Sequence, residues 1–343
     1  MIFLIPLLFI TILILNDLFK FATGDADLTL MSKKRVKREE VEDKVFWITG
    51  ASRGIGEVLA KQLASLGAKL ILSARNEADL QRVKSQLTGK YAPAEVKILP
   101  LDLASGEDSL REAVERAESF FSGYGVDYMI HNAAYERPKS AALEVGEESL
   151  KAIFNVNVFG TVSLTRLLAP YMVKRGKGHF VVMSSAAGKT PAPGQAVYSA
   201  SKFALNGYFH SLRSEVIVEF CLISSLRILC LSTAVCIALS ERNQGPIEAT
   251  KSSDAGISAQ TRSSEKRLSA ERCAQLIIIA ASHGLKEAWI SYQPVLAVMY
   301  LVQYMPTIGF WLMDKIGEKR VDAAAEKKNT YSLGLLFGKQ KKT

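Results

Sequence analysis

Residues 45–75 read "VFWITGASRGIGEVLAKQLASLGAKLILSAR", and this stretch decides the fold. It starts with an apolar strand pattern, passes through a glycine-rich turn into an amphipathic helix pattern, and ends in a second apolar strand. Strand and helix patterns continue to alternate as far as Glu215. Such alternation predicts an α/β fold in which a parallel sheet is covered by helices on both faces.

The glycine-rich turn "TGASRGIG" predicts a nucleotide-binding loop. Gly50 permits a tight turn, Gly54 lets the backbone approach a pyrophosphate, and Gly56 lets the helix pack closely on the strand. Free N–H groups at the N-terminus of the following helix favour bound phosphates. The predicted cofactor contacts in this loop are Gly50, Ser52, Arg53, Gly54, Ile55 and Gly56.

Arginines near the end of the second strand indicate which dinucleotide is bound. An acidic residue there would accept a hydrogen bond from the ribose 2′-hydroxyl of NAD, but the strand ends in Arg75, and Arg53 lies in the loop. Two guanidiniums suit a 2′-phosphate, so the sequence predicts NADP(H) as the cofactor. The ends of the third and fourth strands are expected to complete the cofactor site, at Asp102, Leu103, Asn132 and Ala133.

Five short motifs, "TGASRGIG", "NAA", "NVNVFG", "SS" and "YSASK", follow one another in an order and spacing that resembles the short-chain dehydrogenase/reductase family. The resemblance implies a single-domain, Rossmann-type doubly wound sheet. The chain departs from the family's usual "NNAG" by carrying His131 and Ala134, and alanine makes that turn less permissive than glycine. By the same resemblance, the catalytic tetrad comprises Asn157, Ser185, Tyr198 and Lys202.

The implied chemistry delivers hydride to a carbonyl carbon and a proton to its oxygen. Tyr198 would donate the proton, and Lys202, one helical turn later, would lower the phenol pKa from its ordinary value of about 10. Lys202 would also hold the nicotinamide ribose. Ser185 would polarise and position the substrate oxygen. Asn157 would interrupt the bonding of its long helix and hold a water that relays protons to the lysine.

The segment after the catalytic helix departs from the family pattern, which continues with a strand, "PG" and a threonine. Residues 216–244 have three readings: a divergent sixth strand, a membrane helix, or a gene-model error such as a translated intron. Glu219 and Arg227 oppose the membrane helix, because a central charge costs about 2.5 to 3.5 kcal/mol on insertion scales. The gene-model error is the favoured hypothesis. Beyond it, Thr250 is the expected clamp on the nicotinamide carboxamide.

The N-terminus predicts an uncleaved membrane anchor over residues 1–21, because "MIFLIPLLFITILIL" lacks any charge and "NDLFKF" extends it to spanning length. A cleaved signal peptide is the alternative. The basic run "KKRVKR" follows the anchor and places the rest of the chain in the cytosol by the positive-inside tendency. A second apolar run, Val295–Met313, predicts a spanning helix, a helix pair that dips into one leaflet, or buried core.

These patterns divide the chain of 343 residues into four segments. They are an anchor at 1–21, a basic linker at 22–43, the catalytic domain at 44–293, and an apolar extension with a basic tail at 294–343. The net charge of +9 is concentrated in short runs, which we interpret as flanks beside a membrane rather than as a nucleic-acid site. Four cysteines match no zinc spacing, so we expect reduced thiols and no metal site.

Within the family, the anchor and the tail "SYQPVLAVMYLVQYMP" resemble membrane-anchored, plant-type proteins similar to dehydrogenase/reductase family member 7. This resemblance implies an NADP(H)-dependent oxidoreductase acting on a lipophilic carbonyl or alcohol, such as a steroid, retinoid or other lipid. We expect it at the endoplasmic reticulum or lipid-droplet membrane, and the fold is compatible with a homodimer. The alternatives are a 3-ketosphinganine reductase-like enzyme and a catalytically impaired scaffold.

Overall fold

Parallel strands form the centre of the domain in the computed structural model, which describes residues 4–87, 95–122, 124–138, 140–219, 226–233 and 268–325. The strand order is β3-β2-β1-β4-β5-β6-β7, so β2 and β3 are added on one side of β1 and the strands from β4 onward on the other side. Every pairing is parallel. The strands are β1 (Val45–Thr49), β2 (Lys69–Ser73), β3 (Val96–Ile98), β4 (Tyr128–His131), β5 (Gly178–Met183), β6 (Leu226–Thr233) and β7 (Glu287–Ile290).

Helices cover both faces of the sheet, as the sequence predicts for a doubly wound fold. On one face lie α3 (Gly54–Ser65), α4 (Glu77–Ser85) and α9 (Ala270–Ser282), which bury Leu59, Leu80 and Ile277 in one apolar cluster. On the other face lie α5 (Glu107–Ser119), α7 (Thr161–Lys174) and α8 (Ala196–Glu219), which bury Val114, Leu164 and Phe209 in a second cluster. All five residues of β1 are buried, which explains the unbroken apolar run of that strand.

The segment expected to be a basic linker at 22–43 is instead packed against the domain. Asp27 caps the short helix α2 (Leu28–Met31) by accepting from Leu30 N at 2.9 Å, and its other carboxylate oxygen accepts from Trp289 N at 2.7 Å. Leu30 and Val41 are buried in the core cluster. These apolar and capping contacts make the segment part of the folded domain, although the basic side chains of Lys34, Arg35 and Lys37 are exposed.

The atypical segment after α8 contributes a strand within its described part. β6 pairs with β5 from Leu226 to Leu231 and with β7 from Cys230 to Thr233. A membrane helix through these residues is therefore wrong, because they complete the buried sheet. The gene-model hypothesis concerns the transcript and stays a prediction. Thr250 lies outside the described residues.

The C-terminal apolar run forms two helices rather than one spanning helix. α10 (Val295–Tyr304) ends at Met305, and α11 (Pro306–Ala325) begins at the following proline. Proline lacks the N–H that a continuous helix requires, which explains the break. A single spanning helix over this run is therefore wrong and two helices form instead, while their entry into one leaflet stays a prediction.

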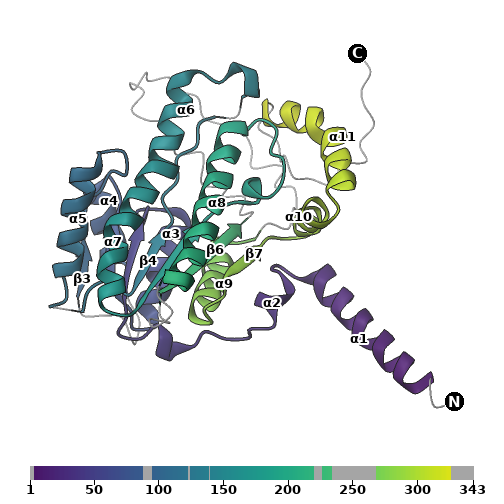
Figure 1. Ribbon diagram of the computed structural model, residues 1–343, viewed down its shortest axis with the longest axis horizontal. Helices are drawn as coiled ribbons and strands as arrows, with labels where there is room; N and C mark the ends of the chain where they lie inside the picture. Colours follow the sequence, from purple (N-terminus) through teal and green to yellow (C-terminus); the bar gives the residue numbers. More distant parts are fainter. Residues whose placement is uncertain are drawn as a thin grey trace, which may run out of the picture.

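Helix α1 (Leu4–Thr23) projects away from the domain at the N-terminal end of the chain (Figure 1). Its 20 residues give a length of about 30 Å, which matches the hydrocarbon thickness of a bilayer. Among the described side chains, a different helix, Glu147–Lys174, is long and apolar enough to cross a membrane. That helix buries Leu164, Leu168 and Met172 against the sheet, so it is a core helix.

Candidate active site

The glycine-rich turn adopts the backbone that its sequence predicts. Gly50 and Gly54 have φ values of +66° and +60°, a region that side chains disfavour. A Cβ at Gly56 would lie 2.2 Å from the carbonyl oxygen of Gly50, so α3 approaches the end of β1 more closely than any side chain permits. The resulting loop leads directly into the N-terminus of α3, where Arg53 provides no side-chain cap. This is the open arrangement that an anionic pyrophosphate requires.

A threonine at the end of β1 ties the loop to the neighbouring strand β4. Thr49 Oγ1 donates to the carbonyl of Ile130 and accepts from the N–H groups of Asn132 and Ala133, each at 3.2 Å. Asn132 returns two bonds from Nδ2, to the carbonyls of Thr49 at 3.0 Å and Gly50 at 3.1 Å. These bonds hold the carboxyl ends of β1 and β4 together at the point where the strand order reverses.

The other side of the loop is held by a charged cluster on α3 and α4. Arg82 donates to the carbonyl of Ser52 at 2.7 Å and forms an ion pair with Glu57 at 3.0 Å. Partial burial would raise the pKa of Glu57, but its hydrogen bonds from Arg82 and Lys61 outweigh that effect and lower the pKa. The cluster therefore keeps the carboxylate charged and the loop in place.

Arg53 and Arg75 are both exposed, at the loop and just beyond the end of β2. They are free to meet a ligand outside the carboxyl edge of the sheet. Asp102 is also exposed, and its Oδ1 accepts from the N–H of Ala104 at 3.0 Å, so it shapes the turn after β3. Leu103 is buried beside Gly160, where a Cβ would lie 2.3 Å from the Leu103 carbonyl oxygen.

Lys202 is the buried, basic member of the predicted tetrad. Its side chain is buried, and Nζ donates to the carbonyl of Met183 at 2.8 Å. Burial lowers the pKa of its ammonium from 10.5 to about 8, while Glu136 opposes the change. Nζ lies 5.5 Å from the centre of the Tyr198 ring on the same helix, α8. A positive charge is thus held beside a phenol that is only partly covered.

The segment after β5 brings Ser185 to the same helix. Ser185 begins the short helix η4 (Ala186–Gly188), and its hydroxyl oxygen accepts from Ala187 N at 3.1 Å. Two bonds fasten η4 to α8, from Ser199 Oγ to the Ala187 carbonyl and from Asn206 Nδ2 to the Gly188 carbonyl at 2.9 Å. The serine-bearing segment and the tyrosine-bearing helix therefore form one unit.

Asn157 lies in a π-helical turn, η3 (Asn155–Gly160), between α6 (Glu147–Phe154) and α7. The predicted interruption of the helix is confirmed. The side chain is buried and clamps the loop after β4, accepting from Tyr135 N at 2.7 Å and donating to Tyr135 O at 3.0 Å. Nδ2 also lies 3.1 Å from Ser201 Oγ, which donates to the Tyr198 carbonyl at 2.7 Å. π-Helical turns occur frequently at functional sites.

The structure thus gathers the predicted residues at the carboxyl edge of the sheet, apart from Thr250, which lies outside the described residues. Sequence reasoning assigned no role to four residues that hold the site together. Thr49 and Ser201 lie inside the motifs "TGASRGIG" and "YSASK", so their position next to predicted site residues could have identified them. Arg82 and the main chain of Tyr135 carry no such signal.

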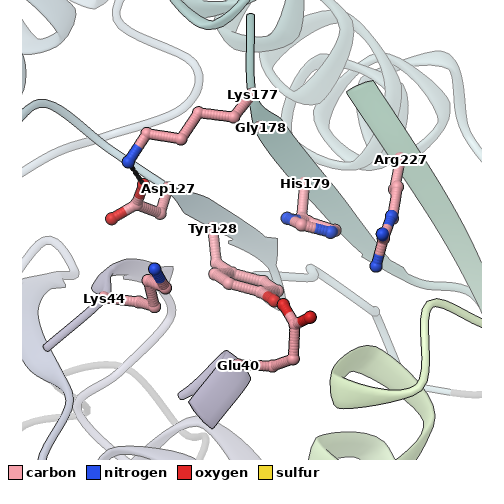
Figure 2. A pocket seen from close by; sticks show the side chains of 8 residues that line it. All are labelled: Glu40, Lys44, Asp127, Tyr128, Lys177, Gly178, His179 and Arg227. Carbon is pink, nitrogen blue, oxygen red and sulfur yellow. Dashed lines mark ion pairs between the residues drawn. The ribbon is translucent and has the colours of Figure 1, made fainter. Parts of the chain in front are cut away.

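A polar pocket of about 180 Å³ opens at the opposite, amino-terminal edge of the sheet (Figure 2). Lys177 pairs with Asp127 at 2.8 Å, and the His179 ring stacks on Tyr128 with centroids 4.2 Å apart. Burial, followed by the charge of Arg227, lowers the pKa of His179 to about 4, so this histidine is neutral at physiological pH. The pocket lies outside the site assembled above.

Comparison with known proteins agrees with this geometry. A family profile described as short chain dehydrogenase matches residues 44–243. Human dehydrogenase/reductase SDR family member 7 is 35% identical over 323 residues, covering 91% of this chain and 89% of that protein. 11-beta-hydroxysteroid dehydrogenase A of Sesamum indicum is 36% identical, covering 52% of this chain and 49% of that protein.

A solved structure, a metagenomic short-chain oxidoreductase in complex with NADP, superposes with a TM-score of 0.51 and 28% identity. The superposition covers 57% of this chain and 84% of that one.

Proposed function

Because this chain belongs to the short-chain dehydrogenase family, we propose that it is an NADP(H)-dependent oxidoreductase acting on a lipophilic carbonyl or alcohol. The observation that carries the proposal is the buried Lys202 ammonium, 5.5 Å from the Tyr198 ring. A buried charge is costly unless it is paired and hydrogen-bonded, and perturbed pKa values gather at functional sites.

The residues present fit a dinucleotide. The close approach at Gly56 and the positive φ at Gly50 leave a cradle that a side chain would fill. Arg53 and Arg75 would hold a 2′-phosphate, and the N-terminus of α3 would face the pyrophosphate. Asp102, Leu103, Asn132 and Ala133 would border the rest of the cofactor, and Lys202 would bind its nicotinamide ribose. When bound, the nicotinamide supplies or accepts a hydride.

Side chains of the protein would transfer the proton to or from the substrate oxygen. Lys202 has a pKa of about 8, so it is mainly charged near neutral pH. That charge favours the phenolate of Tyr198 and makes its proton easier to donate. Ser185 accepts a bond from Ala187 N, which leaves its own hydroxyl hydrogen to bind the substrate oxygen. Asn157 would hold Ser201 and α8 in register with the loop after β4.

Two observations support a lipophilic substrate and a membrane location. One relative carries a hydroxysteroid dehydrogenase name. Helix α1 exposes Phe9, Leu15 and Phe19, as expected for an anchor in the endoplasmic reticulum or lipid-droplet membrane. We propose that α1 crosses or enters the membrane and that the catalytic domain faces the cytosol.

The direct test is turnover by the full chain in detergent, with NADPH or NADH and a panel of steroid, retinoid and aliphatic carbonyls. Tyr198→Phe removes the proton donor and should reduce kcat by about 10² to 10⁴-fold, the usual contribution of general acid catalysis. Tyr171→Phe, an exposed tyrosine on α7, is the matched control. NADPH binding without turnover, unaffected by Tyr198→Phe, would favour the scaffold alternative.

The cofactor preference has a separate test. Arg53→Ala combined with Arg75→Ala should weaken NADPH binding by at least about tenfold and leave NADH binding nearly unchanged, because a charge-assisted contact contributes about 1.5 to 3 kcal/mol. Arg111→Ala, an exposed arginine on α5, should change neither. Equal losses for both cofactors would contradict the assignment of NADP(H).

A further inference from the structure

Large apolar side chains are exposed where α10 meets α11. Tyr304, Met305, Ile308, Phe310 and Trp311 are each between 47% and 71% exposed, and we call these five residues the hairpin tip. Clustered exposed aromatic and aliphatic groups of this kind are unusual on a monomeric soluble protein and mark an interaction surface.

The hairpin tip is displayed by a well-packed support. A Cβ at Gly309 would lie 2.6 Å from Val302 Cα, so α11 crosses α10 at close range. Met313 is buried, and Trp289 packs against Tyr300 with ring centroids 4.7 Å apart. The exposed side chains therefore belong to a folded helix pair and have a defined orientation.

The hairpin continues the apolar surface of α1. The Phe21 ring meets Tyr300 edge-on at 5.2 Å, and Gln293 Nε2 donates to the Phe21 carbonyl at 2.7 Å. The C-terminal end of α1 is thereby fixed to α10, and α1, α10 and α11 lie on the same side of the molecule (Figure 1). The exposed apolar residues of α1 are Phe9, Ile12, Leu13, Leu15, Leu18 and Phe19.

The chemistry of this surface suits a lipid bilayer better than a second protein. Tyrosine and tryptophan favour the membrane–water interface, and Lys315 Nζ lies 4.1 Å above the Trp311 ring, with an ammonium beside an aromatic face. Lys315 is the basic side chain beside the hairpin tip, whereas the basic run after α2 lies against the C-terminal end of α9, where Ser282 Oγ accepts from Lys37 N at 3.2 Å. Apolar side chains flanked by basic ones are the pattern of an interfacial helix.

We propose that the hairpin tip inserts into the surface of the same bilayer that holds α1, and that the substrate enters the active site from that bilayer. The proposal rests on the proposed function for the anchor and for the lipophilic substrate. Its occupant is a lipid surface, and a second copy of the chain is the alternative that the test must separate.

Docking would place the catalytic segment next to the membrane. A Cβ at Gly317 of α11 would lie 3.7 Å from Pro193, in the loop between Ser185 and Tyr198. Lys189, four residues after Ser185, pairs with Glu287 at 2.8 Å, and Glu287 also accepts from Trp289 Nε1 at 2.7 Å. α11 thus touches the segment that carries the catalytic groups directly, and α10 is linked to it through β7, where Trp289 packs against Tyr300.

Trp311 provides a natural probe, because the other two tryptophans, Trp47 and Trp289, are buried. The full chain would be reconstituted into vesicles of phosphatidylcholine and phosphatidylserine, with and without brominated acyl chains. Insertion predicts a blue-shifted Trp311 emission and strong quenching by the bromines. Trp311→Phe should remove this quenched signal, which separates it from the two core tryptophans.

The outcomes distinguish this proposal from the proposed function. If the protein floats with the vesicles but Trp311 shows neither shift nor quenching, α1 anchors the chain and the docking proposal is overturned. If Trp311 is blue-shifted without quenching and the detergent-solubilised protein is a dimer, the hairpin tip binds a second copy and the proposal is again overturned. A chain that does not float at all contradicts the anchor itself.

A kinetic test addresses the substrate route. Ile308→Ser with Phe310→Ser should raise KM at least about tenfold for a carbonyl lipid embedded in vesicles, since each side chain loses most of its apolar transfer energy. KM for a small water-soluble carbonyl should stay unchanged. Leu150→Ser with Tyr171→Ser, exposed apolar residues on α6 and α7, forms the matched control. Equal effects on both substrates would contradict entry from the bilayer.

Discussion

Replacing Lys202 by methionine is expected to stabilise the protein while abolishing turnover. Lys202 is 2% exposed, and burial lowers the pKa of its ammonium from 10.5 to about 8. The unfolded chain binds this proton more tightly than the folded one, so the folded state loses roughly 3 kcal/mol of stability at about pH 7. Methionine keeps much of the volume and carries no charge, so it removes this cost.

One contact opposes the gain. Lys202 Nζ donates to the Met183 carbonyl at 2.8 Å, and methionine cannot. A hydrogen bond donated by a charged group contributes about 1.5 to 3 kcal/mol, so the net stabilisation at about pH 7 should be at most about 1.5 kcal/mol. In a protein of this size that raises the melting temperature by at most about 2 to 3 °C.

The pH dependence gives the sharper test. Because the folded pKa lies below the unfolded one, the cost is fully present below about pH 8 and vanishes as the pH rises toward 10.5. The advantage of Lys202→Met should therefore shrink by about 2 kcal/mol between about pH 7 and about pH 9.5. Melting of the cofactor-free full chain in detergent, followed by fluorescence at both pH values, measures it. A variant that melts below the wild type at both values, or by a margin independent of pH, would refute the reasoning.

Three further changes probe the glycine loop, the π-helical turn and the N-terminal segment. Gly56→Ala should weaken NADPH binding measured by calorimetry and cost about 1 to 3 kcal/mol, because its Cβ would meet the Gly50 carbonyl at 2.2 Å. Asn157→Ala should lower the free energy of unfolding by about 2 to 4 kcal/mol through lost buried bonds, whereas the exposed neighbour Asn155→Ala should change it by less than about 0.5 kcal/mol. Similar denaturation midpoints for these two variants would be evidence against the clamp. Asp27→Ala should free the N-terminal segment and speed its proteolysis, since both carboxylate oxygens hold buried backbone N–H groups; an unchanged cleavage rate would contradict that role.

The parts of the fold that depend on local patterns could be predicted from the sequence. The strands from β1 to β5 are short runs rich in apolar residues, and the turn at Gly50 and Gly54 requires residues that tolerate positive φ. A sixth strand is only one of three readings of residues 216–244, and no pattern predicts β7. Tyr198 and Lys202 could be predicted, because their spacing places them on one face of a helix. The break at Pro306 likewise follows from the ring of the residue itself.

The contacts that hold the site together could not be predicted, because their partners are distant in sequence. Asn157 binds Tyr135 and Ser201, which are 22 and 44 positions away. Asp27 binds Trp289, which is 262 positions away. The basic composition of residues 22–43 therefore predicted a linker although the segment packs against the domain. Neither periodicity nor composition identifies a partner at such separations. The packing of the sheet and its helices brings these residues together.

The places where this chain breaks local rules also lie together, and this favours a functional over a structural interpretation of the site. A buried ammonium at Lys202 and a π-helical turn at Asn157 each cost stability in isolation, and Gly50, needed for its positive φ, loses more backbone entropy on folding than a residue with a side chain. All three stand at the carboxyl edge of the strands, around the reversal between β1 and β4. A fold selected for stability alone has no reason to concentrate such costs at one crevice, whereas a site that must hold a dinucleotide and move a proton does. Lys202→Met tests this interpretation, because removing the ammonium should raise the free energy of unfolding only if the ammonium destabilises the folded protein.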